Sequence, residues 1–481
     1  MLKLMHRLLV GLLSFLLVSN MTLAGPAPAS HTIAIVGGQL IDGNGKDPVQ
    51  DYVVLIEGNR ITSVGPKAQV SIPAGAEIIN AAGKSVLPGL INSNCHLTLN
   101  PMDTDINIWS QGLPKAQEAL QNRLKVLLLE GVTSIRDTTG FTKPLLAVKP
   151  KVDSDEIPAA RLFIGGRSIA SPQRFDSRFL DDLKNGKNKE DEAYFRLIYK
   201  VPDDLKPIEG PEYNFWKISL TGGDYWNADN TMSDDLLKAI VQEGHRVGKV
   251  IDAHVQGMKG IRSGLAAGLD VMEHPNLSEP LPMDLIREYA AKGVFLSPLH
   301  TTVEGYVEIF DNPYILNDPI YKSFLSPEDY AQLQDIKERM IRARSHPDQK
   351  PTDIPTPIGV ILSYDEWRTA LQFTRENLRK FIEAKTRIVM STDCSSTPFN
   401  FVEMNWHVRE LQTYVRFGMT PMEALQTATK NPAELLKMSH DLGTIEAGKL
   451  ADVIVVEGDP LIDMDALRHV DVVIKDGIRY K

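Results

Sequence analysis

The feature that most constrains this chain is a repeated alternation of short apolar runs with amphipathic stretches of helical length. It extends from about residue 85 to residue 442. Such an alternation favours parallel βα units over separate all-α or all-β domains. Eight units predict an α/β protein with the TIM (β/α)8 barrel fold, whose active site lies at the C-terminal ends of the strands. The expected strands cover residues 86–92, 132–135, 161–164, 215–218, 250–253, 270–272, 294–297 and 388–390.

Two long segments interrupt this alternation. Residues 171–210 are polar and include a charge-rich run at 181–192, and residues 300–360 are rich in Tyr, Pro and Asp. Long connections at the active-site end of a barrel often form lids or substrate walls. A solvated surface excursion is the alternative for each segment.

The two ends of the chain follow a different pattern. Residues 31–84 and 443–481 contain short β-rich runs separated by turn signals, and 32–36 and 453–456 are examples. We expect these runs to form the hairpins of a small sheet outside the barrel.

The composition limits the class of partner. Of the 481 residues, 43% are hydrophobic and 24% are charged, which suits one large barrel with a small accessory domain. The formal net charge of −10 argues against nucleic acid as a partner, because phosphate binding needs a basic surface. A small-molecule substrate is therefore expected, and a homo-oligomer is compatible with these features.

Residues 1–24 have the pattern of a secretory signal peptide. Lys3 and Arg7 precede the apolar core 8–18, and small residues follow it. This apolar run is too short to span a bilayer comfortably, although a retained N-terminal anchor is the alternative. The pattern predicts a periplasmic or secreted protein without stable membrane insertion after cleavage.

The chain has only two cysteines, Cys95 and Cys394, so a disulfide framework does not hold this fold together. Cys394 follows the eighth expected strand, which neighbours the first strand in a closed barrel, and a disulfide is therefore geometrically conceivable. We favour the other interpretation, two buried small hydrophobic side chains.

A polar cluster follows the first expected strand, and alternation along a strand places Asn94 and His96 on the same side. Residues 88–96 resemble the Pro-Gly-Leu-Ile-Asp-x-His-x-His signature of the amidohydrolase superfamily. In that family both histidines enter a metal site. His96 stands at the second histidine, whereas Asn94 replaces the first and Asn92 replaces the aspartate. The resemblance is to imidazolonepropionase-like and Xaa-Pro dipeptidase (prolidase)-like members, and it implies one discontinuous β-sandwich domain from the two ends of the chain.

Lys217 lies in a segment, 215–223, that resembles the family's Phe-x-Lys-Ile-x-x-x-Gly-Gly strand. An unpaired ammonium inside a barrel is costly. The resemblance implies that CO2 converts this lysine into a carbamate that bridges two metals. A simple salt bridge to Asp393 is the alternative.

Three further residues fit the family pattern at later strand ends. His254 and His274 match its two single histidines, and Asp393 matches the aspartate that binds metal and takes the proton from the attacking water. The resemblance implies a divalent metal, with zinc as the first choice, in one or two ions.

Asn94 is the departure from the family pattern that bears most on activity. A neutral amide oxygen is a weaker zinc ligand than imidazole, so the ion shared with His96 and Asp393 should be weakened and the ion at His254 and His274 largely spared. Three outcomes stay open: a binuclear site in which Asn94 or water fills the gap, a mononuclear enzyme, or an inactive relative kept as a binding protein.

The resulting hypothesis is an exported metal-dependent amidohydrolase that hydrolyses an amide- or peptide-type C–N bond of a small substrate, such as an N-acyl amino acid or a dipeptide. The alternative is a catalytically impaired binding protein with the same fold. We expect a substrate with a free carboxylate, held by an arginine such as Arg136 or Arg167. Further candidates at strand ends are Gln256 and His300, for which surface solvation or core hydrogen bonding is the competing interpretation.

Overall fold

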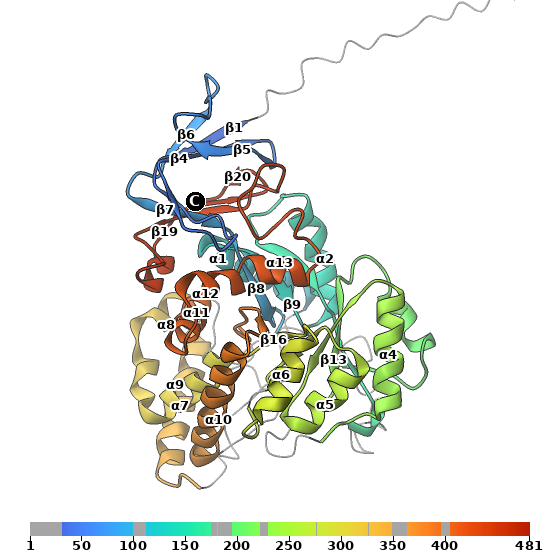
Figure 1. Ribbon diagram of the computed structural model, residues 1–481. Helices are drawn as coiled ribbons and strands as arrows, with labels where there is room; N and C mark the ends of the chain where they lie inside the picture. Colours follow the sequence, from blue (N-terminus) through green and yellow to red (C-terminus); the bar gives the residue numbers. More distant parts are fainter. Residues whose placement is uncertain are drawn as a thin grey trace, which may run out of the picture.

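The computed structural model describes residues 31–99, 112–174, 180, 195–221, 229–275, 277–325, 327–348, 363–395 and 405–481. The predicted signal peptide, the charge-rich run 181–192 and the glycines at 222 and 223 lie outside the described residues. Figure 1 shows a small β-rich part at one end, built from the blue N-terminal and red C-terminal segments, beside a larger α/β part.

The small part consists of two sheets. One sheet has the order β5-β4-β1-β6 and comes from the N-terminal segment alone, whereas the other has the order β20-β19-β18-β7-β2-β3 and combines both ends of the chain. Apolar side chains of both sheets, such as Ile33, Ile56, Val453 and Ile474, share one core. The strands are β1 (Thr32–Val36), β2 (Gln39–Leu40), β3 (Val49–Gln50), β4 (Tyr52–Glu57), β5 (Arg60–Pro66), β6 (Glu77–Asn80), β7 (Lys84–Pro88), β18 (Val453–Glu457), β19 (Val470–Lys475) and β20 (Ile478–Arg479).

The larger part is a TIM barrel of parallel strands, as the alternation in the sequence predicts. Two parallel sheets contribute, β10-β9-β8 and β12-β11-β13-β14-β15-β16-β17. The strands are β8 (Leu90–Cys95), β9 (Val132–Asp137), β10 (Arg161–Ile164), β11 (Ser168–Ala170), β12 (Phe195–Leu197), β13 (Phe215–Ser219), β14 (Val250–His254), β15 (Val271–Glu273), β16 (Phe295–Ser297) and β17 (Arg387–Ile388).

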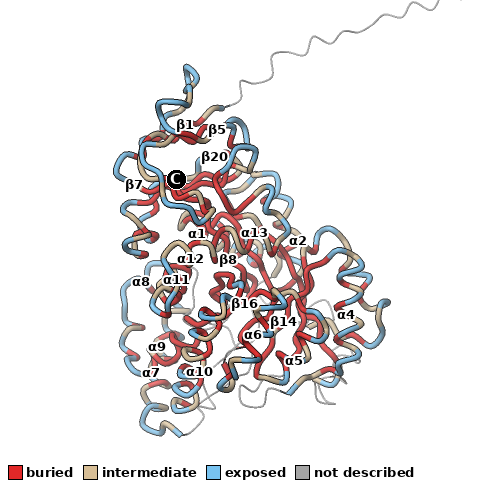
Figure 2. Tube along the Cα trace, in the orientation of Figure 1, coloured by how far each residue is buried: buried red, intermediate tan, exposed pale blue. Residues whose placement is uncertain are grey.

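Backbone hydrogen bonds close the ring between these two sheets. The amide of Asn214, just before β13, donates to the carbonyl of Ile164 in β10 at 2.8 Å. On the other side, the amide of Ser93 in β8 donates to the carbonyl of Met390 at 2.9 Å, and Asp393 N donates to Asn94 O at 3.0 Å. The first and eighth strands are therefore neighbours, and the buried core follows the barrel strands in Figure 2.

Helices surround the barrel, and their boundaries follow ordinary capping rules. Ser233 accepts a hydrogen bond from the backbone of Leu236 and caps the start of α4. Ser363 forms a capping box with Glu366 at the start of α10. The helices are α1 (Leu113–Leu129), α2 (Thr142–Asp153), α4 (Asp234–Arg246), α5 (Gly257–Ala267), α6 (Met283–Ala291), α10 (Tyr364–Glu383), α11 (Trp406–Arg416), α12 (Pro421–Thr427) and α13 (Lys430–Leu435).

The long segment after β16 forms helices. It contains α7 (His300–Asp311), α8 (Pro319–Phe324) and α9 (Pro327–Arg344), which pack into a second apolar cluster with α10. This cluster includes the stacked rings of Tyr306 and Trp367, 4.0 Å apart. The described part of the earlier insertion contains β12 and the 3-10 helices η1 (Pro172–Arg174) and η3 (Asp203–Ile208).

The prediction of a single strand over 86–92 is wrong in one respect. The chain divides at Gly89: β7 joins the small six-stranded sheet, and β8 begins the barrel. A Cβ atom at Gly89 would overlap the side chain of Thr133, so glycine permits this close approach to the neighbouring strand β9. One continuous apolar segment therefore serves two sheets.

Candidate active site

The parallel strands bring the five best candidate residues to one end of the barrel. His96 directly follows β8, Lys217 lies within β13, His254 ends β14, His274 follows β15, and Asp393 lies beyond β17. His96, Lys217, His274 and Asp393 are all buried, with exposed fractions of 7% or less. This is the end at which TIM barrels carry their active sites.

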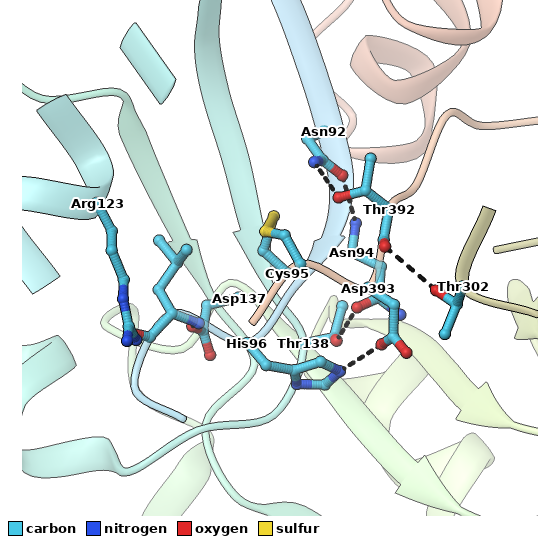
Figure 3. The surroundings of a disulfide bond; sticks show 12 residues. Asn92, Asn94, Cys95, His96, Arg123, Asp137, Thr138, Thr302, Thr392 and Asp393 are labelled. Carbon is cyan, nitrogen blue, oxygen red and sulfur yellow. Dashed lines mark hydrogen bonds and ion pairs between the residues drawn. A yellow bond between two sulfur atoms is a disulfide. The ribbon is translucent and has the colours of Figure 1, made fainter. Parts of the chain in front are cut away.

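His96 and Asp393 are in direct contact across the seam between the first and last strands (Figure 3). The Nε2 atom of His96 lies 2.9 Å from Oδ1 of Asp393, and its Nδ1 atom lies 2.8 Å from the carbonyl oxygen of Thr139. Burial disfavours an imidazolium here, but the hydrogen bond and the charge of Asp393 outweigh it and raise the pKa of His96. The pair can therefore hold a proton between a ring nitrogen and a carboxylate.

His254 and His274 form a second pair, with ring centroids 5.0 Å apart. Burial lowers the pKa of His274 to about 4 and the pKa of His254 well below its ordinary value. Burial therefore favours the neutral form of both rings, which carries a lone pair. Nδ1 of His274 is buried without a hydrogen-bond partner among the described residues. Neutral imidazoles of this kind are suited to binding a metal.

Lys217 lies in a group of buried charges inside the barrel. Its ammonium forms an ion pair with Glu273 and lies 3.9 Å from Oδ1 of Asp252. The other oxygen of Asp252 is 2.9 Å from the guanidinium of Arg136. Burial lowers the pKa of Lys217 to about 8, so a fraction of the amine is neutral near that pH. The salt-bridge alternative had named Asp393, whereas the ion pair here is with Glu273.

The Asn94 side chain is completely buried, and its oxygen is already engaged. Oδ1 accepts a hydrogen bond from the hydroxyl of Thr138 at 2.8 Å, and Nδ2 has no partner among the described residues. Asn92 donates to the hydroxyl of Thr392 at 2.8 Å. The side chain of Asn94 therefore bonds to the residue after β9, whereas its backbone carbonyl accepts a hydrogen bond across the seam from Asp393.

Cys95 and Cys394 form a disulfide, shown in Figure 3, so our preference for two separate buried thiols was wrong. The two residues are paired in a parallel bridge, and their Cα atoms are 4.7 Å apart. Both lie next to candidate site residues.

The structure gives the four predicted substrate residues different surroundings. Arg136 is fully buried, pairs with Asp252 and stacks over the ring of Phe215 at 4.1 Å, so we assign it a structural role. Arg167 lies between β10 and β11 and is 9% exposed. Gln256 is buried at the start of α5, and His300 is buried at the start of α7.

Sequence reasoning missed two carboxylates beside the site. Asp252 lies two residues before His254 and therefore on the same side of β14, and Glu273 directly precedes His274. Strand alternation could have indicated Asp252. Sequence reasoning also missed the left-handed backbone of His274 (φ 56°) and Asp393 (φ 55°). Glycine adopts this conformation most readily, and other residues that adopt it are concentrated at functional sites.

The side-chain nitrogen and oxygen atoms at this site are of the kinds that bind a divalent cation. Among the described residues, no three His, Cys, Asp or Glu side chains are grouped so that they could hold one ion. Two pairs are present, His96 with Asp393 and His254 with His274, and each needs a further ligand. Imidazole nitrogen and carboxylate oxygen are the donors that zinc accepts, and the unpartnered Nδ1 of His274 leaves one donor free.

Comparison with known proteins identifies the family. A model described as "Amidohydrolase family" matches residues 85–479, so the chain belongs to the amidohydrolase family. This family model places the chain in the class of amidohydrolases, which are hydrolases of carbon–nitrogen bonds.

Individual relatives are distant. Ochratoxinase of Aspergillus niger is 23% identical over 472 residues, covering 93% of this chain and 86% of that protein. Imidazolonepropionase of a Geobacillus species is 36% identical over 106 residues, covering 21% of this chain and 24% of that protein. A Xaa-Pro dipeptidase solved with methionine in its active site is similar in fold, with a TM-score of 0.70 and 20% identity over 94% of this chain and all of that one. Of the described helices, none has the length and hydropathy needed to cross a membrane.

Proposed function

We propose that this protein is an exported metal-dependent amidohydrolase that cleaves an amide- or peptide-type bond of a small substrate with a free carboxylate. The observation that carries the proposal is the meeting of His96 with Asp393 at 2.9 Å, at the same barrel end as Lys217, His254 and His274. Family membership and the similarity to ochratoxinase and to a Xaa-Pro dipeptidase support it.

His96, His254, His274 and Asp393 would hold the metal, and zinc is the first choice. Lys217 would add an oxygen ligand after reaction with CO2, which its buried position and lowered pKa favour. A bound divalent ion would supply Lewis-acid polarisation of the substrate carbonyl and an acidified water.

The protein's own groups would then move the proton. Asp393 is the base, because its carboxylate is buried and already oriented by the hydrogen bond to His96. It would accept the proton of the attacking water and release it to the leaving nitrogen. The Thr139 carbonyl fixes the orientation of the His96 ring through Nδ1.

Arg167 is the proposed partner of the substrate carboxylate, because it follows β10 at the end of the barrel that carries the candidate site, whereas Arg136 is fully buried inside the barrel. A planar guanidinium pairs with a carboxylate through two parallel hydrogen bonds. The secretory pattern of residues 1–24 supports export to the periplasm or the medium.

The test is an assay of protein purified with divalent metal and bicarbonate. The panel is Xaa-Pro dipeptides, N-acyl amino acids, cyclic imides and lactones, with metal content measured on the same sample. We expect turnover of amides that carry a free carboxylate, and a loss of about 10²- to 10⁴-fold in Asp393→Asn. The absence of turnover at full metal occupancy would favour a binding protein. Turnover of neutral lactones alone would refute the proposal that the substrate carries a free carboxylate.

A further inference from the structure

The disulfide lies at the seam between the first and last strands of the barrel. It joins Cys95, the last residue of β8, to Cys394 beyond β17, and the two are separated by 299 positions in the sequence. The exposed fractions of the two residues are 0% and 2%. The disulfide is therefore buried inside the folded protein and shielded from reductants in solution.

The bonded cysteines are direct neighbours of the candidate proton-transfer pair. Cys95 precedes His96, and Cys394 follows Asp393. The backbone repeats the connection, because His96 N donates to Cys394 O at 2.9 Å and Asp393 N donates to Asn94 O at 3.0 Å. The seam at this level is thus held by the disulfide, by backbone hydrogen bonds that include these two, and by the contact between His96 and Asp393.

The backbone around Asp393 needs such support. Asp393 and Ser395 both have left-handed backbones, with φ values of 55° and 66°, on either side of Cys394. Conformations of this kind persist only where the surroundings determine them. Asn94 gives no support from its side chain, because its oxygen bonds to Thr138, just beyond the other neighbouring strand β9.

We propose that the disulfide between Cys95 and Cys394 is a positioning element of the active site, which sets the distance and orientation of His96 relative to Asp393. The proposal rests on the proposed function for its catalytic consequence. A disulfide that only stabilised the fold would change the unfolding equilibrium and leave the folded site intact. A positioning disulfide changes the site in molecules that are fully folded.

The double variant Cys95→Ala/Cys394→Ala separates the two roles, and Cys95→Val/Cys394→Ala provides a second version with less empty volume. Leu162→Ala is the matched control, since Leu162 is a buried core residue of β10, away from this seam. All proteins are measured well below their melting temperatures. The measurements are metal affinity by titration of the metal-free protein with Zn²⁺, kcat and KM separately, and the crystal structure around His96 and Asp393.

We expect the double variants to lose about 10- to 100-fold in metal affinity and in kcat, with little change in KM, as is usual when the support of a ligand is removed. The control should keep wild-type values. In the crystal, the contact between His96 and Asp393 should lengthen or become heterogeneous. Wild-type affinity, kcat and side-chain positions in a folded double variant would overturn the proposal.

Reduction of the wild-type protein gives a reversible version of the same test. In mild denaturant, dithiothreitol transfers two electrons to the disulfide, each sulfur gains a proton, and the reagent closes into a cyclic disulfide. Affinity and kcat should fall after refolding in the reduced state and return after reoxidation; an unchanged reduced protein would also overturn the proposal. A wild-type protein without metal or turnover would instead refute the proposed function, and the crystal comparison would still decide the positioning role.

Discussion

The oxygen of Asn94 accepts a hydrogen bond from the hydroxyl of Thr138 at 2.8 Å, inside a fully buried part of the barrel. The same hydroxyl could accept a hydrogen bond from an imidazole at position 94 and orient it towards a metal. Asn94→His should therefore raise the occupancy of the ion at His96 and Asp393. Titration of metal into both proteins measures this, and an unchanged occupancy would show that the pocket is shaped for the amide.

Lys217→Ala tests whether Lys217 is carboxylated and binds metal. If carboxylated Lys217 binds metal, the variant should lose the metal, and a short carboxylic acid such as acetate or propionate should restore part of it. Lys217→Met is the control that keeps the volume of the side chain but has no amine. If Lys217 serves only as the partner of Glu273, both variants should keep their metal content and lose stability.

Arg136→Met tests the structural role of the buried guanidinium. Removing one member of the pair with Asp252 leaves a carboxylate without its partner at 2.9 Å, which should cost about 3–5 kcal/mol in the free energy of unfolding. Arg136→Met combined with Asp252→Asn should cost less than the single change. Urea unfolding of the wild type, the two single variants and the double variant measures this, and additive losses in the double variant would contradict the pairing.

Glu410 makes unfolding depend on pH. Burial raises the pKa of this carboxyl to about 7, against the hydrogen bonds that the backbone amides of His300 and Thr301 donate to it at 3.1 and 2.8 Å. The protonated form is favoured in the folded state. The contribution of Glu410 to the free energy of unfolding is therefore fully present below pH 4.5. About 3 kcal/mol of this free energy is lost as the pH rises to 7.

Glu410→Gln removes this titration. Between pH 4.5 and pH 7 the wild type should lose stability relative to the variant, because only the wild type ionises at this position. Above pH 7 the difference between their free energies of unfolding should stay constant. Urea unfolding at four pH values measures the difference. A difference that does not vary with pH would show that Glu410 keeps an ordinary pKa.

The sequence predicted the barrel because its signals are local. Strand-length apolar runs and helical amphipathic stretches depend on neighbouring residues only, and the amidohydrolase motifs placed His96, Lys217, His254, His274 and Asp393 at strand ends. Features set by contacts between distant segments could not be predicted. The break at Gly89 depends on Thr133 of the next strand, and the pairing of Arg136 with Asp252 crosses the barrel interior.

The cysteines show the same limit. Whether Cys95 and Cys394 bond depends on the register between the first and eighth strands, which no local pattern fixes. The left-handed conformations of His274 and Asp393 are likewise imposed by the surrounding fold, since neither residue type favours them as glycine does.

The place of β18 between β7 and β19 has a consequence for biosynthesis. β7 is made early and leads through Gly89 directly into β8, yet its antiparallel partner β18 lies near the end of the chain. At a translation rate of roughly 5–20 residues per second, the edge of β7 waits tens of seconds for this partner. Pairing of β7 on this side therefore has to wait for β18, and a chain terminated before Val453 would leave an unpaired β edge open to self-association.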